Sequence, residues 1–153
     1  MNQRLKNTTE KLRKLGLHFK ILELCEPAVS VRDVVNKSQG DVKVDEICKT
    51  LLMKGKDPFA VLIKGLDKVD LKKVENLIKH KVRFLSREEI KMQFEFELGE
   101  VCPLFLEIPV IVDKKVLELE TANMGSGDLF CGIEMNPRDI LKCINHKIED
   151  VVV

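Results

Sequence analysis

The sequence 47-ICKTLLMKGKDPFAVLI-63 decides the fold, because it combines two apolar runs with a turn between them. Residues 47–53 are apolar on both faces of an extended chain, which is typical of a central strand in a sheet. Residues 54–58 contain Gly55 and Pro58, which favour a turn, and residues 59–63 form the second apolar run. We therefore predict two strands that pair as a hairpin.

Side chains that can cap helices recur along the rest of the chain. A Ser, Thr, Asp or Asn at the start of a helix accepts a hydrogen bond from a backbone N–H that has no partner within the helix. The capping positions are Asn7 or Thr8 before a helix ending at Gly16, Ser30 with Asp33 before a helix ending at Gly40, Asp70 before a helix from residue 71, Ser86 with Glu89 before residues 87–94, and Asn136 before a helix that begins with Pro137.

Further strands are predicted between these helices, over residues 17–21, 82–85, 108–112, 116–119 and 130–135. Hairpins interspersed with helices indicate one α/β domain with a mixed sheet, rather than a doubly wound parallel sheet. We expect this domain over residues 16–147, after a basic N-terminal helix or arm in residues 1–15 and before a C-terminal tail in residues 148–153.

The overall composition excludes several classes of protein. The chain has 153 residues, a net charge of +1 and no apolar run near the roughly 18 residues of a membrane span, so we expect a soluble cytoplasmic protein that binds neither DNA nor a membrane. Its five cysteines are scattered singly, which suits a reducing compartment. Cys143 and His146 alone are too few ligands for zinc, so we expect no metal.

The first twenty residues carry six basic side chains and one acidic side chain. Two interpretations are open for this segment. It can be a solvated helix packed on the edge of the domain, or a basic arm that meets the phosphate backbone of a nucleic acid.

Lys49 is the most unusual residue of the predicted hairpin. An ammonium group within an apolar strand is costly unless it is paired or points into a wet cavity. The alternative is a strand-end lysine whose stem covers apolar surface while its amine reaches solvent. In a pocket, burial would lower the pKa of Lys49, and the amine could transfer a proton or hold an anionic or carbonyl oxygen.

Gly125-Ser126-Gly127 predicts a turn with exposed backbone N–H groups, which can donate to an oxygen that gains charge during a reaction. The alternative is a merely flexible turn. No Gly-x-Ser-x-Gly motif supplies a nucleophilic serine. A thiol-dependent enzyme using Cys48 or Cys131 is another alternative, although a strand cysteine is commonly a small core residue. For a hydrolase, the pattern favours an activated water as nucleophile.

Three segments together resemble the YbaK/ProX family of aminoacyl-tRNA editing domains. They are Glu46–Leu52, Gly99–Pro103, and Gly125–Gly127 with its continuation Gly132–Leu141. The resemblance covers residues 16–143. It implies a single α/β domain with a mixed, partly barrel-like sheet surrounded by helices, and an enzyme that hydrolyses the ester between a wrong amino acid and its tRNA without a cofactor.

The resemblance also implies the site and its partners. Lys49 matches the lysine that positions the aminoacyl ester, and we expect it to act with Gly125, Ser126 and Gly127, while a water assisted by the substrate's ribose hydroxyl attacks. The substrate-binding residues implied are Ser30, Thr50, Gly99, Val101, Pro103 and Gly132. The implied partner is the acceptor end of a mischarged tRNA, of the alanyl- or cysteinyl-tRNA(Pro) kind, with prolyl-tRNA synthetase as a candidate second partner.

Three residues depart from the family's pattern. Glu95 and Phe105 stand where the family often has other residues, and Gly132 stands where some members have an acid. Glu95 and Phe105 could reshape the mouth of the pocket. These departures leave a second hypothesis open, a non-catalytic module that binds tRNA or an aminoacyl nucleotide on the same fold.

Overall fold

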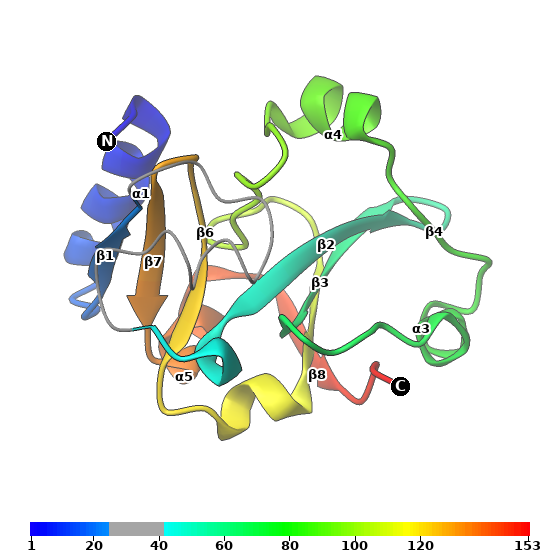
Figure 1. The fold of residues 1–153 in the computed structure, drawn as a ribbon. Helices are drawn as coiled ribbons and strands as arrows, with labels where there is room; N and C mark the ends of the chain where they lie inside the picture. Colours follow the sequence, from blue (N-terminus) through cyan, green and yellow to red (C-terminus); the bar gives the residue numbers. More distant parts are fainter. Residues whose placement is uncertain (25–41) are drawn as a thin grey trace.

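The computed structural model describes residues 1–24 and 42–153 (Figure 1). Its α-helices are α1 (Gln3–Lys14), α3 (Leu71–Ile78), α4 (Arg87–Phe94) and α5 (Pro137–Ile140). Its strands are β1 (Lys20–Glu23), β2 (Cys48–Lys54), β3 (Pro58–Lys64), β4 (Arg83–Phe84), β5 (Val110–Asp113), β6 (Ala122–Asp128), β7 (Cys131–Met135) and β8 (His146–Glu149). Short 3-10 helices are η1 (Val44–Glu46), η2 (Lys114–Glu118) and η3 (Leu141–Cys143). The helix predicted from Ser30 to Gly40 lies outside the described residues.

The strands form two sheets, which confirms the predicted mixed α/β domain. β1, β7 and β6 make an antiparallel sheet, and β4, β2, β3, β5 and β8 make a mixed one (Figure 1). Within the described residues an isolated parallel bridge joins Ile47, just before β2, to Asn123 in β6. The two sheets do not close into a barrel. No described helix is long and apolar enough to cross a membrane.

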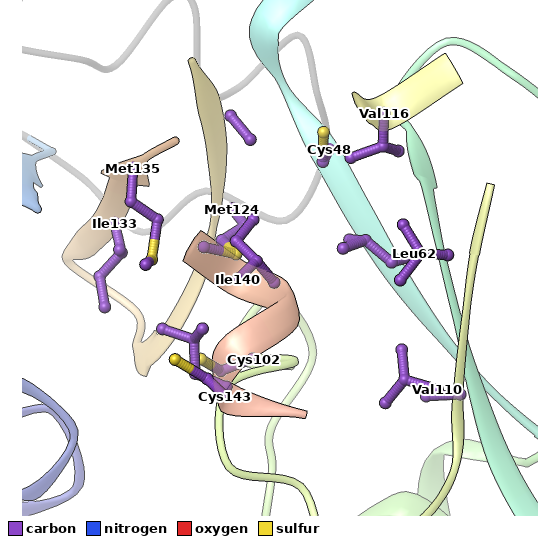
Figure 2. Close-up of a cluster of buried hydrophobic side chains, with 14 of the residues drawn as sticks. Cys48, Leu62, Cys102, Val110, Val116, Met124, Ile133, Met135, Ile140 and Cys143 are labelled. Atoms are coloured by element: carbon purple, nitrogen blue, oxygen red, sulfur yellow. The ribbon is translucent and has the colours of Figure 1, made fainter. Parts of the chain in front are cut away.

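The predicted hairpin is confirmed as β2 paired with β3. The antiparallel register runs from Cys48 opposite Lys64 to Lys54 opposite Pro58. β3 is covered on both faces, because Ala60 and Leu62 pack into one core cluster while Val61 packs into another. Figure 2 shows Leu62 in the first cluster, with side chains from β5, β6 and α5 around it. Burial on both faces explains the continuous apolar run of this strand.

Three helix caps predicted from sequence are confirmed. Asp70 accepts from the backbone N–H of Lys72 at 3.0 Å, and Asn136 accepts from Arg138 at 2.9 Å. Ser86 and Glu89 form the reciprocal capping box. These caps fix where α3, α4 and α5 begin, because each satisfies a backbone N–H that has no partner in its helix.

Two predicted elements are wrong in type. Residues 116–119 were expected as a strand, but residues 114–118 form the 3-10 helix η2, because the Asp113 carboxylate accepts from Lys115 N–H and caps it. Residues 125–127 were expected as a turn, but they belong to β6, where Gly125 pairs with Gly132 of β7 and the register is irregular between Gly125 and Asp128.

Both ends of the chain pack more closely than the sequence suggests. α1 begins at Gln3, capped by Asn2, rather than after Asn7 or Thr8. Leu5 and Leu12 of α1 are fully buried, so the basic N-terminal segment is a packed helix and not a detachable arm. Residues 148–153, expected as a tail, complete β8 and bury Val151 beside β5, where its N–H donates to the Asp113 carboxylate at 3.0 Å.

The packing of α1 yields a stability prediction. Leu12→Ala removes a fully buried side chain and should lower the free energy of unfolding by about 2–5 kcal/mol, measured by urea denaturation. Leu15→Ala, at the end of the same helix, removes a side chain that is 53% exposed and should change it little. Equal losses in the two variants would contradict the packed position of α1.

Candidate active site

A cavity of about 370 Å³ opens between the two sheets. Its walls come from both sheets, from α4 and from the segment before residue 102. The lining residues are Leu22, Leu24, Ile47, Cys48, Lys49, Thr50, Leu51, Leu52, Phe84, Leu85, Ile90, Leu98, Gly99, Val101, Asn123, Met124, Gly125, Asp128, Leu129, Cys131 and Gly132. Most of these side chains are apolar, so the few polar ones are distinctive.

The cavity runs along the edge of β2 that faces away from β3, which we call the outer edge. Other segments contact this edge at its two ends. Ile47 is bridged to Asn123 at one end, and the Leu52 carbonyl accepts from Leu85 N–H at the other. In an antiparallel ladder, the backbone groups of successive residues point to opposite edges, so those of residues two apart point to the same edge. Since the Leu52 carbonyl points to the outer edge, the backbone N–H and carbonyl of Thr50 point there too. No described strand pairs with this stretch, so Thr50 offers its backbone groups to the cavity.

The floor of the cavity is a pair of glycines. Gly125 in β6 lies opposite Gly132 in β7, and Leu22 in β1 lies on the other side of Gly132. A side chain at position 125 would collide with the Val101 carbonyl, because the Cβ would come well inside the 3.0 Å limit of real Cβ contacts. The segment containing Gly99 and Val101 therefore lies directly against β6, and only glycine allows this approach.

Lys49 is half-buried and lines the cavity from β2. Its partner across the hairpin is Ile63, which places Lys49 on the opposite face of the strand from Thr50. Burial lowers the pKa of Lys49 from its ordinary value, and the positive charge of Lys68 lowers it further, whereas the Asp67 carboxylate raises it. The amine is therefore a weaker base than a solvated lysine and is more readily neutral.

The cavity brings together six of the residues implied by the resemblance: Lys49, Thr50, Gly99, Val101, Gly125 and Gly132. Three others are absent from its lining. Pro103 is buried beside it. The Ser126 hydroxyl donates to the Cys131 carbonyl at 2.6 Å, and Gly127, with φ of 87°, makes room for Arg4 of α1. Ser30 lies outside the described residues.

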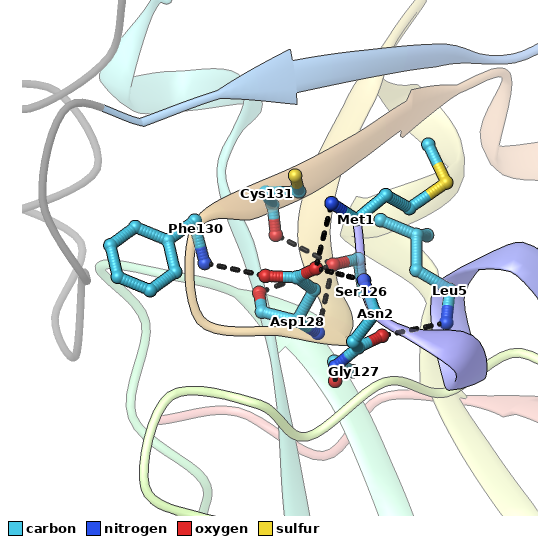
Figure 3. A network of polar contacts seen from close by, with 8 residues as sticks. All are labelled: Met1, Asn2, Leu5, Ser126, Gly127, Asp128, Phe130 and Cys131. Atoms are coloured by element: carbon cyan, nitrogen blue, oxygen red, sulfur yellow. Dashed lines mark hydrogen bonds and ion pairs between the residues drawn. The ribbon is translucent and has the colours of Figure 1, made fainter.

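Asp128 also lines the cavity, although the sequence did not single it out. Its carboxylate accepts from the backbone N–H groups of Asn2 at 2.7 Å and Phe130 at 2.9 Å, and the Met1 amine lies 3.9 Å away (Figure 3). Asp128 thus fastens the start of α1 to the β6–β7 turn. Its partner Asn2 is far away in sequence, so no local signal could have revealed this role.

Glu95 and Phe105, which were expected to reshape the mouth of the pocket, do not line the cavity. Glu95 ends α4 in a left-handed conformation with an exposed side chain, and Phe105 packs under the Lys11 ammonium, 5.2 Å from the ring centre. The expectation that Glu95 and Phe105 alter its mouth is therefore wrong for the described part of the cavity, and Gly132 is the departure that remains in it.

The two candidate nucleophilic thiols are poorly suited to that role. Burial raises the pKa of Cys48 to about 12, and burial also raises the pKa of Cys131. The thiolate is the reactive form of cysteine, and at neutral pH almost none is present at Cys48. This finding disfavours a thiol-dependent enzyme.

Comparison with known proteins identifies the class to which this cavity belongs. The family model of the aminoacyl-tRNA editing domain matches residues 25–143, so the chain belongs to that family. It is 30% identical over 103 residues to "Uncharacterized protein YwhH" of Bacillus subtilis (strain 168), covering 65% of this chain and 66% of YwhH.

Two further similarities are to a curated protein and a solved structure whose descriptions mention proline--tRNA ligase or prolyl tRNA synthetase. A "Proline--tRNA ligase" of Legionella pneumophila (strain Lens) is 27% identical over 113 residues, covering 67% of this chain but 20% of the ligase. The chain therefore spans about a fifth of that relative. A solved structure described as "a putative trans-editing enzyme for prolyl tRNA synthetase" superposes with a TM-score of 0.85 and 21% identity, covering 100% of this chain and 99% of the other. At this identity the superposition establishes the fold.

The close contact between Gly125 and the Val101 carbonyl predicts that a side chain at position 125 destabilises the protein. Gly125→Ala should displace the Val101 segment and lower the free energy of unfolding by about 1–3 kcal/mol, measured by thermal denaturation. Gly132→Ala is the matched control, because its Cβ would meet its nearest neighbour at 3.4 Å, an ordinary contact. A Gly125→Ala variant as stable as Gly132→Ala would contradict the packing of the two segments.

The charges around Lys49 predict opposite shifts of its pKa. Asp67→Asn removes a carboxylate that favours the ammonium form, so the pKa should fall further. Lys68→Gln removes a repelling charge, so the pKa should rise. The pH dependence of Lys49 acetylation, followed by mass spectrometry, measures both shifts. Shifts in the same direction would show that these two residues are not the charges that Lys49 senses.

Proposed function

We propose that this editing domain hydrolyses the ester that joins an amino acid to the 3′ end of a mischarged tRNA. The observation that carries the proposal is one cavity lined by Lys49, by the Thr50 edge of β2 and by the floor at Gly125. Membership of the editing-domain family supports the same substrate class.

The chemistry proposed needs positioned donors more than a protein nucleophile. Water attack on the ester carbonyl creates an oxyanion, and each well-placed donor can lower the barrier by roughly 2.7–4 kcal/mol. We assign this role to the Lys49 amine, aided by backbone N–H groups along the cavity. The raised pKa of Cys48 supports water as the nucleophile, with the substrate's neighbouring ribose hydroxyl as the group that assists it.

The size of the cavity supports a small amino acid. Its volume of about 370 Å³ must hold the terminal ribose as well as the aminoacyl group. A pocket of fixed size rejects a larger side chain by steric exclusion, whereas it accepts a smaller one readily. We therefore assign alanine or cysteine as the amino acid removed.

Proline-specific tRNA is the proposed carrier. The relative named as a proline--tRNA ligase and the structure described as a trans-editing enzyme for prolyl-tRNA synthetase support this choice. The domain would then work in the cytoplasm beside prolyl-tRNA synthetase. The exposed basic residues of α1, including Lys6 and Lys14, supply positive charge for phosphate contacts.

A panel of mischarged tRNAs tests the proposal. Wild-type protein should release the amino acid from alanyl- or cysteinyl-tRNA(Pro), and Lys49→Ala should reduce kcat/KM by on the order of 100-fold or more. Lys54→Ala, on the same strand but outside the cavity lining, should keep wild-type activity. Thermal denaturation should show that both variants remain folded.

Two outcomes would contradict the proposal. Undiminished turnover in Lys49→Ala would remove this lysine from the mechanism. Tight binding of tRNA without hydrolysis of any mischarged tRNA in the panel would instead favour the non-catalytic binding module, for which Gly132 in the cavity floor is the specific observation.

A further inference from the structure

Asn123 combines deep burial with an unused hydrogen-bonding atom. Its side chain is 3% exposed and it lines the cavity from β6. Its amide oxygen Oδ1 has no hydrogen-bond partner among the described residues. A buried polar atom without a partner lowers stability, because the water that solvated it in the unfolded chain is lost without replacement.

The strand geometry aims this amide at the cavity. Asn123 and Gly125 are two residues apart in β6, so their side-chain positions lie on the same face of the sheet. Gly125 faces the Val101 segment, and Gly132 beside it lies next to Leu22, which also lines the cavity. Met124, between them, packs in the apolar core and also lines the cavity (Figure 2).

A second unused oxygen lies on the facing wall. The Thr50 hydroxyl Oγ1 is buried without a partner among the described residues, and it comes from the edge of β2 that meets β6 through the bridge of Ile47 to Asn123. An amide oxygen that accepts and a hydroxyl that can accept or donate therefore lie in the wall of a cavity that Lys49 also lines. A ligand that matches these groups carries a hydrogen-bond acceptor, such as a carbonyl oxygen, next to a hydrogen-bond donor.

We propose that Asn123 is a substrate-positioning residue whose amide oxygen accepts a hydrogen bond from a donor next to the ester carbonyl of the aminoacyl group. This inference rests on the proposed function. Two groups of the substrate share the required chemistry, the α-ammonium of the amino acid and the free hydroxyl of the terminal ribose. Either one places the carbonyl toward Lys49 while its own N–H or O–H reaches Asn123.

The test uses tRNA(Pro) that carries alanine through an amide in place of the ester, so that binding is measured without turnover. Asn123→Leu should weaken binding by on the order of 10- to 100-fold. Asn123→Asp retains an acceptor and should recover most of the affinity. Thr9→Ala is the control, because it removes a buried hydroxyl that is hydrogen-bonded within α1 and does not line the cavity.

Two modified probes identify the donor. With a propionyl group in place of alanine, which lacks the α-ammonium, the penalty of Asn123→Leu should vanish if the ammonium is the donor, and with a 2′-deoxy terminal adenosine it should vanish if the hydroxyl is. Asn123→Leu should also keep or raise the melting temperature, because it removes an unpaired polar atom, whereas Thr9→Ala should lower it.

The possible failures are distinguishable. Equal affinity of wild type and Asn123→Leu for every probe, a penalty that no probe modification abolishes, or absence of binding by wild type would each overturn the role of Asn123. Binding that depends on Asn123, together with no hydrolysis of the corresponding ester, would support this inference and overturn the proposed deacylase activity.

Discussion

The site depends on one constraint, the outer edge of β2 between Ile47 and Leu52, with which no strand of the described residues pairs. A central strand normally satisfies its backbone groups on both edges, and an open stretch next to a cavity exposes them to whatever occupies it. The bridge to Asn123 at one end and the hydrogen bond to Leu85 at the other hold this stretch open. If a strand paired along it, the edge would close and Thr50 would have no access to a ligand.

Close packing around the opening keeps it rigid. Gly125 lets the Val101 segment lie against β6, and Asp128 fastens α1 to the β6–β7 turn beside the floor (Figure 3). α1 in turn buries Leu5 and Leu12 in the main core. The basic helix and the cavity are therefore parts of one packed body, and preorganised donors in such a body need little rearrangement as charge develops.

The features predictable from sequence were those set by neighbouring residues. The β2–β3 hairpin, the capping box at Ser86 and the unusual position of Lys49 all follow from local pattern. The strand expected at 116–119 was wrong because Asp113 caps a 3-10 helix, and that carboxylate also bonds to Val151 from the far end of the chain. Asn123 could not be predicted as a site residue for the same reason, because its position depends on the contact between β6 and the start of β2, which are far apart in sequence.

The cavity brings together buried oxygens that have no hydrogen-bond partner in the part of the chain that the structure describes. The oxygens of Thr50 and Asn123, without partners in residues 1–24 and 42–153, lower stability, and burial disfavours the charged form of Lys49. A sequence under pressure for stability alone would replace these groups with apolar side chains of similar size. Their clustering on facing walls of one cavity is the arrangement expected where a bound ester supplies the missing hydrogen bonds, so the cost in the free protein becomes affinity in the complex.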